Sequence, residues 1–122
     1  PGADDFLTPE RLYLRIAEKA AEWNSEYGNV GLVVGATRPE HVADIRRLAP
    51  GLPFLIPGVG AQGGSIEEVV RAGRDSEGEG LIFNVSRAVL YADPESPDPA
   101  AASRRAALEY RDAINKAFSE NE

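Results

Sequence analysis

The sequence has no cysteine and no methionine, and its single histidine is His41. Without cysteine it can form neither a disulfide nor a thiolate metal site, which fits a cytosolic protein. Basic charge is also scarce: 20 acidic residues outweigh 13 lysines and arginines, giving a net charge of −7. No apolar run approaches the roughly 20 residues needed to cross a bilayer. We therefore expect a cytoplasmic protein that binds neither nucleic acid nor membrane.

Three short apolar runs stand out, at residues 31–36, 53–57 and 80–85. They are continuous rather than alternating, which is typical of parallel strands covered on both faces. Helical periodicity surrounds them: over residues 9–27, after residues 37–40 as far as Pro50, from Ser65 to Gly73, and from about residue 100 to 118. The predicted order is α-β-α-β-α-β-α, within one domain of residues 1–122.

The spacing of the predicted strands indicates repeated βα units, because a new strand starts every 22 to 27 residues. Three strands make a very small parallel sheet, whereas doubly wound domains have about five and a (β/α)₈ barrel has eight. Two of the three strands would be unpaired edges. We interpret residues 1–122 as the C-terminal three βα units of a TIM (β/α)₈ barrel, incomplete as an isolated chain.

The predicted helices carry start signals and apolar faces. Thr37 and Glu40 have capping-box spacing, and so do Ser65 and Glu68. Ser65 is therefore better explained as an N-cap than as a nucleophile. The first helix has one apolar stripe, of the kind that faces a core, formed by Leu12, Ile16, Ala20, Trp23 and Tyr27. Trp23 is expected to be a core or half-core anchor, and His41 a surface residue.

A glycine-rich loop follows the second predicted strand, and residues 58–63 fit the pattern G-x-G-x-x-G. A dinucleotide fingerprint belongs at the first strand-to-helix turn of its domain and needs an acidic residue at the end of the next strand. Here a whole βα unit precedes the loop, and the next strand ends in Asn84, Val85 and Ser86. The context therefore argues against dinucleotide binding.

A phosphate-binding loop fits this context better. Gly60 and Gly63 let the backbone approach an anion closely, and Gln62 can donate from its side-chain amide. The next strand leads into Ser86 and Arg87, whose guanidinium can bind the same phosphate with two hydrogen bonds. Taken separately, the glycine-rich loop could be only a tight turn, and Arg87 could be only a solvated charge. The combination favours phosphate, which barrels commonly bind after their last two strands.

Three stretches carry a resemblance to a known family. They are Asn29-Val-Gly-Leu-Val-Val-Gly-Ala-Thr37, Phe54-Leu-Ile-Pro-Gly-Val-Gly-Ala-Gln-Gly-Gly64 and Asn84-Val-Ser-Arg87. In sequence and separation they resemble the C-terminal part of the orotidine 5′-phosphate decarboxylase family. The similarity is greatest to the subgroup of actinobacteria and related bacteria, and it extends over nearly the whole chain.

The resemblance implies a (β/α)₈ barrel, usually a homodimer, that needs no cofactor and no metal. Such a barrel converts orotidine 5′-monophosphate to uridine 5′-monophosphate (UMP) and CO₂ in de novo pyrimidine synthesis. It also implies that Gln62 and Arg87 hold the 5′-phosphate, with help from backbone N–H groups near Ser86. Pro57 matches a proline that lies beside the pyrimidine.

The chemical part of the family pattern is missing. The family's catalytic array is a lysine followed by Asp-x-Lys-x-x-Asp on early strands, whereas the only lysines here are Lys19 and Lys116, both on predicted helices. We therefore expect no catalytic residue in this chain and no activity from it alone. An N-terminal barrel segment, from the same protein or a separate chain, would have to supply the array. Two alternatives stay open: a phosphosugar-acting barrel of different chemistry, and a non-catalytic phosphate- or nucleotide-binding module.

Overall fold

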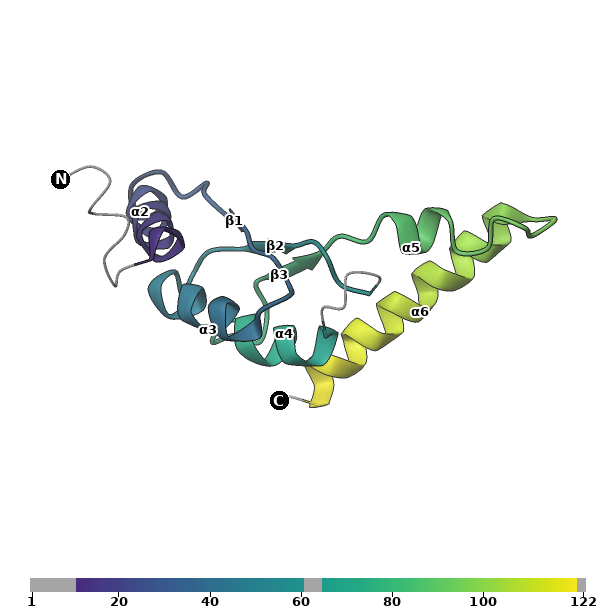
Figure 1. Ribbon diagram of the computed structural model, residues 1–122. Helices are drawn as coiled ribbons and strands as arrows, with labels where there is room; N and C mark the ends of the chain where they lie inside the picture. The colour runs from purple at the N-terminus through teal and green to yellow at the C-terminus, as the bar shows by residue number, and fades with distance from the viewer. Residues whose placement is uncertain (1–10, 61–64, 121–122) are drawn as a thin grey trace.

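The computed structural model describes residues 11–60 and 65–120 (Figure 1). Their elements, in chain order, are α2 (Leu12–Tyr27), β1 (Leu32–Val33), α3 (Pro39–Leu48), β2 (Phe54–Ile56), α4 (Ile66–Gly73), β3 (Leu81–Phe83), α5 (Arg87–Leu90) and α6 (Pro99–Glu120). All three strands fall inside the predicted runs, and the four predicted helices are present. The short helix α5, directly after β3, was not predicted.

The three strands form one parallel sheet in the order β1-β2-β3, which confirms the α/β class. Helices α3 and α4 lie side by side against one face of this sheet (Figure 1). Phe54 and Ile56 point to that face and are completely buried, together with Val42 of α3 and Val69 of α4. The hydrophobic core therefore lies between the sheet and these two helices.

The opposite face of the sheet is open. Val33, Leu55 and Ile82 form one row across the three strands, and they are 70%, 38% and 59% exposed. The expectation of strands covered on both faces is therefore wrong for this chain. In the described residues, helices pack on one side only, so burial alternates along β2 even though its residues are all apolar.

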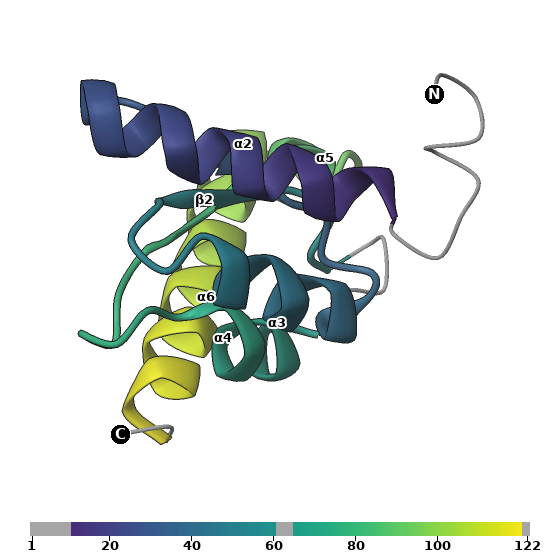
Figure 2. The same ribbon diagram turned by 90° about the vertical axis from the view of Figure 1, so that its left-hand side faces the viewer.

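Helix α2 packs against α3 at the β1 end of the sheet (Figures 1 and 2). Its buried residues are Ala17 and Ala20, so most of the predicted apolar stripe faces outward. Trp23 is 48% exposed, and the Lys19 ammonium lies 5.6 Å from the centroid of its ring. The prediction of Trp23 as a core or half-core anchor is wrong, because Trp23 is exposed and the alanines of α2 are its buried residues.

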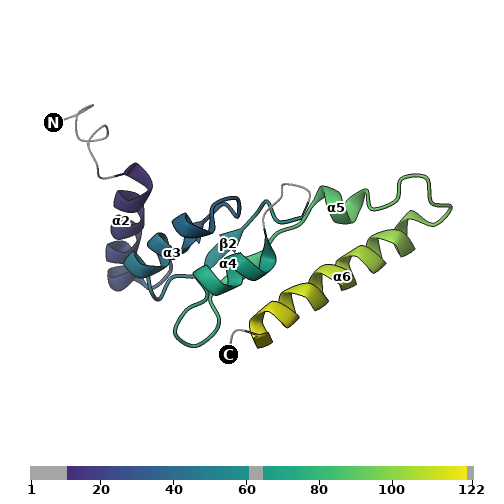
Figure 3. The same ribbon diagram turned by 60° about the horizontal axis from the view of Figure 1, so that its bottom comes forward.

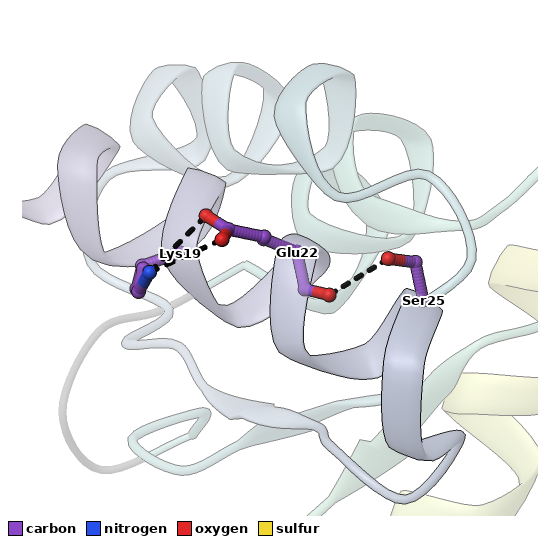
Figure 4. A network of polar contacts seen from close by, with 3 residues as sticks. All are labelled: Lys19, Glu22 and Ser25. Carbon is purple, nitrogen blue, oxygen red and sulfur yellow. Dashed lines mark hydrogen bonds and ion pairs between the residues drawn. The ribbon is translucent and has the colours of Figure 1, made fainter.

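The outer surface of α2 carries local polar contacts between its own residues (Figure 4). The Lys19 ammonium lies 3.2 and 3.3 Å from the two carboxylate oxygens of Glu22, and the Ser25 hydroxyl donates to the Glu22 carbonyl at 2.7 Å. Exposed pairs of this kind contribute little to stability. The helix ends at Gly28, whose left-handed conformation (φ 68°) lets its N–H donate to the Asn24 carbonyl.

Of the two predicted capping boxes, one shows its N-cap hydrogen bond. The Ser65 hydroxyl accepts from the Glu68 N–H at 3.3 Å, as expected. Helix α3 instead begins at Pro39, with Arg38 as an N-cap that makes no side-chain cap bond. Thr37 lies one residue too early to cap it, because proline favours the first helical position.

Helix α6 runs along both α4 and α5, and its N-terminal part projects from the body of the protein (Figures 1 and 3). It contributes Ala102 and Ala117 to the buried surface, while Leu108, Ile114 and Phe118 are half-buried. No helix in the described ranges is both long enough and apolar enough to span a membrane.

At the end of the sheet where the strands begin, the side chain of Arg46 is only 8% exposed. Its guanidinium lies over the ring of Phe54, with Cζ 3.7 Å from the ring centroid. It donates five hydrogen bonds, 2.6 to 3.4 Å long, to the backbone carbonyls of Ala49, Pro50, Leu52, Gly73 and Gly80. One side chain thus joins the ends of α3 and α4 to the segments that enter β2 and β3.

Burial lowers the pKa of Arg46 below the ordinary value of an arginine, and the carboxylate of Asp75 partly opposes this. An arginine remains charged at neutral pH, and hydrogen bonds from a charged donor are stronger than neutral ones. The Ala49 and Gly80 carbonyls also accept from the backbone N–H groups of Leu52 and Phe54. Loss of the guanidinium would remove the donor that Arg46 supplies to the carbonyls of Leu52 and Gly73, at 2.7 and 2.6 Å, and a buried acceptor without a donor is costly.

We expect Arg46→Met to lower the free energy of unfolding by at least about 3 kcal/mol, because several buried carbonyls lose their donor. The matched control is Arg47→Met, since Arg47 is exposed and pairs with Asp44 at the surface of the same helix. The control should change stability by less than about 0.5 kcal/mol. Urea unfolding followed by circular dichroism measures both, and equal midpoints for the two variants would contradict the role of Arg46.

Candidate functional site

The three strands end at one edge of the sheet, and the segments that follow them surround a cavity of about 460 Å³. Its lining comes from residues 35–37 after β1, residues 57–59 after β2 and residues 84–88 after β3. In parallel α/β sheets, ligands bind outside the carboxyl ends of the strands. This cavity is therefore the candidate site.

The cavity brings together three of the predicted site residues, namely Pro57, Ser86 and Arg87. Thr37 and Asn84 line it as well, although they were not among the predicted site residues. The available signal was position: Thr37 directly follows the apolar run of residues 31–36, and Asn84 lies near the end of the run of residues 80–85. Gln62 and Gly63 lie outside the described residues, so their predicted roles stay predictions.

The glycine-rich loop faces two ways. Gly58 lines the cavity, whereas Gly60 lines a separate hollow beside α6, together with Ser65, Ala113 and Lys116. Both glycines have positive φ angles, 85° and 81°, which residues with a side chain rarely adopt. Glycine at these two positions is therefore required by the backbone path of the loop.

The charge of the cavity differs from that of the whole chain. Among the described lining residues Arg87 is the only charged one, although the protein has a net charge of −7. Arg87 is exposed at the first position of α5, and it makes no ion pair with another residue of the described ranges. Nearby, the Asn84 amide lies 3.5 Å from the Ser86 hydroxyl. This arrangement suits a small anion.

His41 lies away from this cavity, on α3. Its ring stacks on Tyr13 with centroids 4.7 Å apart, and its Nε2 is 3.1 Å from the Arg11 guanidinium. It is half-buried rather than fully on the surface. Within residues 11–60 and 65–120, no group of three or more histidines and carboxylates could hold a metal ion.

Residues 3–106 match the sequence pattern of the orotidine 5′-phosphate decarboxylase / HUMPS family. The chain belongs to this family. A protein of Azoarcus sp. (strain BH72) named orotidine 5′-phosphate decarboxylase is 52% identical over 120 residues, which are 94% of this chain and 44% of that protein. A protein of the same name from Aromatoleum aromaticum is 55% identical over 122 residues, with 95% and 44% covered.

Solved structures of the family agree with the fold. The structure of Leishmania donovani OMP decarboxylase is 40% identical in sequence and superimposes with a TM-score of 0.67, over 90% of this chain and 40% of that chain. The chain thus spans less than half the length of the proteins to which it is similar. The family and the α/β fold are established, whereas the activity of a complete protein is a matter for proposal.

The loop geometry yields a stability prediction. Gly58→Ala should destabilise the chain by about 1–2 kcal/mol, because alanine is strained at a positive φ. Gly35→Ala is the matched control: Gly35 lines the same cavity, has no positive φ, and has open space where a Cβ would lie. Urea unfolding of the two variants measures the difference, and a Gly58→Ala midpoint equal to that of Gly35→Ala would contradict the argument.

Proposed function

We propose that this chain is the C-terminal part of an orotidine 5′-phosphate decarboxylase and holds the 5′-phosphate of the substrate. The observation that carries the proposal is the cavity at the strand ends, whose single charged lining residue in the described chain is Arg87. Membership of the decarboxylase family supports the identity of the reaction, from orotidine 5′-monophosphate to UMP and CO₂.

In this proposal two loops grip the phosphate from two sides. Arg87 binds it with its guanidinium, and the backbone N–H near Ser86 adds a hydrogen bond. From the glycine-rich loop, Gln62 donates through its amide while Gly60 and Gly63 let the backbone come close. Pro57 lies beside the pyrimidine. Binding energy from a remote phosphate accelerates a reaction when it orients and supports the reacting group.

The chemistry itself is assigned to an N-terminal barrel segment. This chain would contribute three of eight strands, and the segment the other five together with the lysine and the Asp-x-Lys-x-x-Asp array. The exposed row of Val33, Leu55 and Ile82 supports this, because it is the face that would turn toward the interior of a closed barrel. We expect the completed barrel to be a cytoplasmic homodimer.

The chain alone should not decarboxylate orotidine 5′-monophosphate, whereas the chain combined with its N-terminal segment should. The loss of substrate absorbance and the release of CO₂ measure the activity. Activity in the isolated chain would refute the assignment of the chemistry to the other segment. A completed, folded barrel without decarboxylase activity would refute the proposed reaction and favour a phosphosugar-acting barrel.

In the completed barrel, Arg87→Ala should raise KM and lower kcat/KM by roughly 10- to 100-fold, the effect of losing a charged hydrogen-bond donor to the phosphate. Arg105→Ala is the control, because Arg105 is an exposed arginine on α6 away from the cavity lining. Steady-state kinetics decide the matter: if the two variants match the parent, Arg87 does not bind the substrate.

A further inference from the structure

Tyr110 lies on α6, the helix that runs along both α4 and α5 (Figure 3). Its side chain is half-buried and borders a hollow that it shares with Phe83 at the end of β3, Val85 of the following segment and Val89 of α5. Tyr110 therefore lies beside the segment that carries Ser86 and Arg87.

The same side chain contacts the glycine-rich loop. A Cβ built on Gly60 would lie 2.9 Å from Cζ of Tyr110 and 3.1 Å from its Cε1, with the phenol oxygen nearer still. Real Cβ atoms essentially never lie closer than 3.0 Å to such a neighbour, so the phenol occupies the space that a side chain at residue 60 would need. The backbone of Gly60, at φ 81°, lies directly against the hydroxyl end of Tyr110.

We propose that Tyr110 is a positioning residue, which sets the position of Gly60 relative to the Ser86–Arg87 segment and so the geometry of phosphate binding. The inference rests on the proposed function. No residue of α6 belongs to the described lining of the cavity, so Tyr110 acts through the two loops and does not touch the substrate. A phosphate held from two sides needs both sides at a fixed separation, and a shift of about 1 Å can cost 100-fold in rate.

Two substitutions at this position separate the contributions of the side chain. Tyr110→Ala removes the phenol that lies against Gly60 and enlarges the hollow beside Val85 and Val89, so Gly60 loses its support from α6. Tyr110→Phe keeps the ring beside Val85 and Val89 but removes the oxygen nearest Gly60, so it should have a smaller effect of the same kind. The control is Glu109→Ala, the exposed neighbour on the same helix.

The experiment compares two substrates in the completed barrel: orotidine 5′-monophosphate, and orotidine, which has no phosphate. If Tyr110→Ala displaces the phosphate-binding residues, kcat/KM for the phosphorylated substrate should fall by about tenfold or more. The kcat/KM for orotidine should change less than about twofold, because orotidine has no phosphate to bind. The quantity to compare is the ratio of kcat/KM for orotidine 5′-monophosphate to kcat/KM for orotidine. Gly60→Ala should lower this ratio as well. The double variant with Tyr110→Ala and Gly60→Ala should lose less than the product of the two single effects, because both substitutions disturb one contact.

An equal loss of kcat/KM on both substrates would mean that Tyr110 only stabilises the fold, and it would overturn the proposal. A ratio of the two kcat/KM values that stays unchanged in all the variants would overturn it too. If thermal unfolding shows that Tyr110→Ala does not fold, Tyr110→Phe and Tyr110→Leu test the proposal by the same ratio.

The proposed function can fail separately from the role of Tyr110. A parent barrel that does not prefer the phosphorylated substrate would overturn the proposed phosphate binding, and the role of Tyr110 with it. A preference that persists unchanged in the variants would overturn the role of Tyr110 alone.

Discussion

The hydrogen bonds of one buried side chain, Arg46, determine where the strands begin. Its guanidinium joins the ends of α3 and α4 to the backbone that enters β2 and β3. These two strands are only three residues long, so a fixed start also fixes the end. The cavity lies at those ends. The charge of Arg46, bound by backbone carbonyls, thus anchors the starts of the two strands whose other ends lead into the loops of the cavity.

The sequence predicted those features that depend on neighbouring residues. The apolar runs marked the strands, and the Ser65 cap was recognisable because its partner is three residues away. Contacts between distant residues were not predictable in this way. The carbonyls that Arg46 binds on Gly73 and Gly80 lie 27 and 34 residues along the chain, and no local pattern indicates them. Periodicity identified an apolar stripe on α2, but the alanines, and not Trp23, make the contact with α3.

The candidate site was partly predictable for the same reason. Arg87, Ser86 and Pro57 were selected because they follow strands, and parallel strands bring such residues to one edge. Thr37 and Asn84 satisfy the same rule but were assigned to a cap and to a strand end. The orientation of Gly60 toward α6, away from the cavity, depends on the packing of a helix much later in the chain. The residues proposed to grip the phosphate thus lie on loops whose relative position is set by elements outside the cavity.

The shortness of the strands has a consequence for how the chain behaves in solution. β1 and β3 are the edges of the described sheet, and exposed edges are templates for pairing with other chains. An edge of two or three residues offers few unpaired N–H and C=O groups, and so a weak template for such pairing. The net charge of −7 adds repulsion between copies. Short strands and a net negative charge on every copy therefore both oppose edge-to-edge aggregation into fibres, which an exposed apolar sheet would otherwise favour.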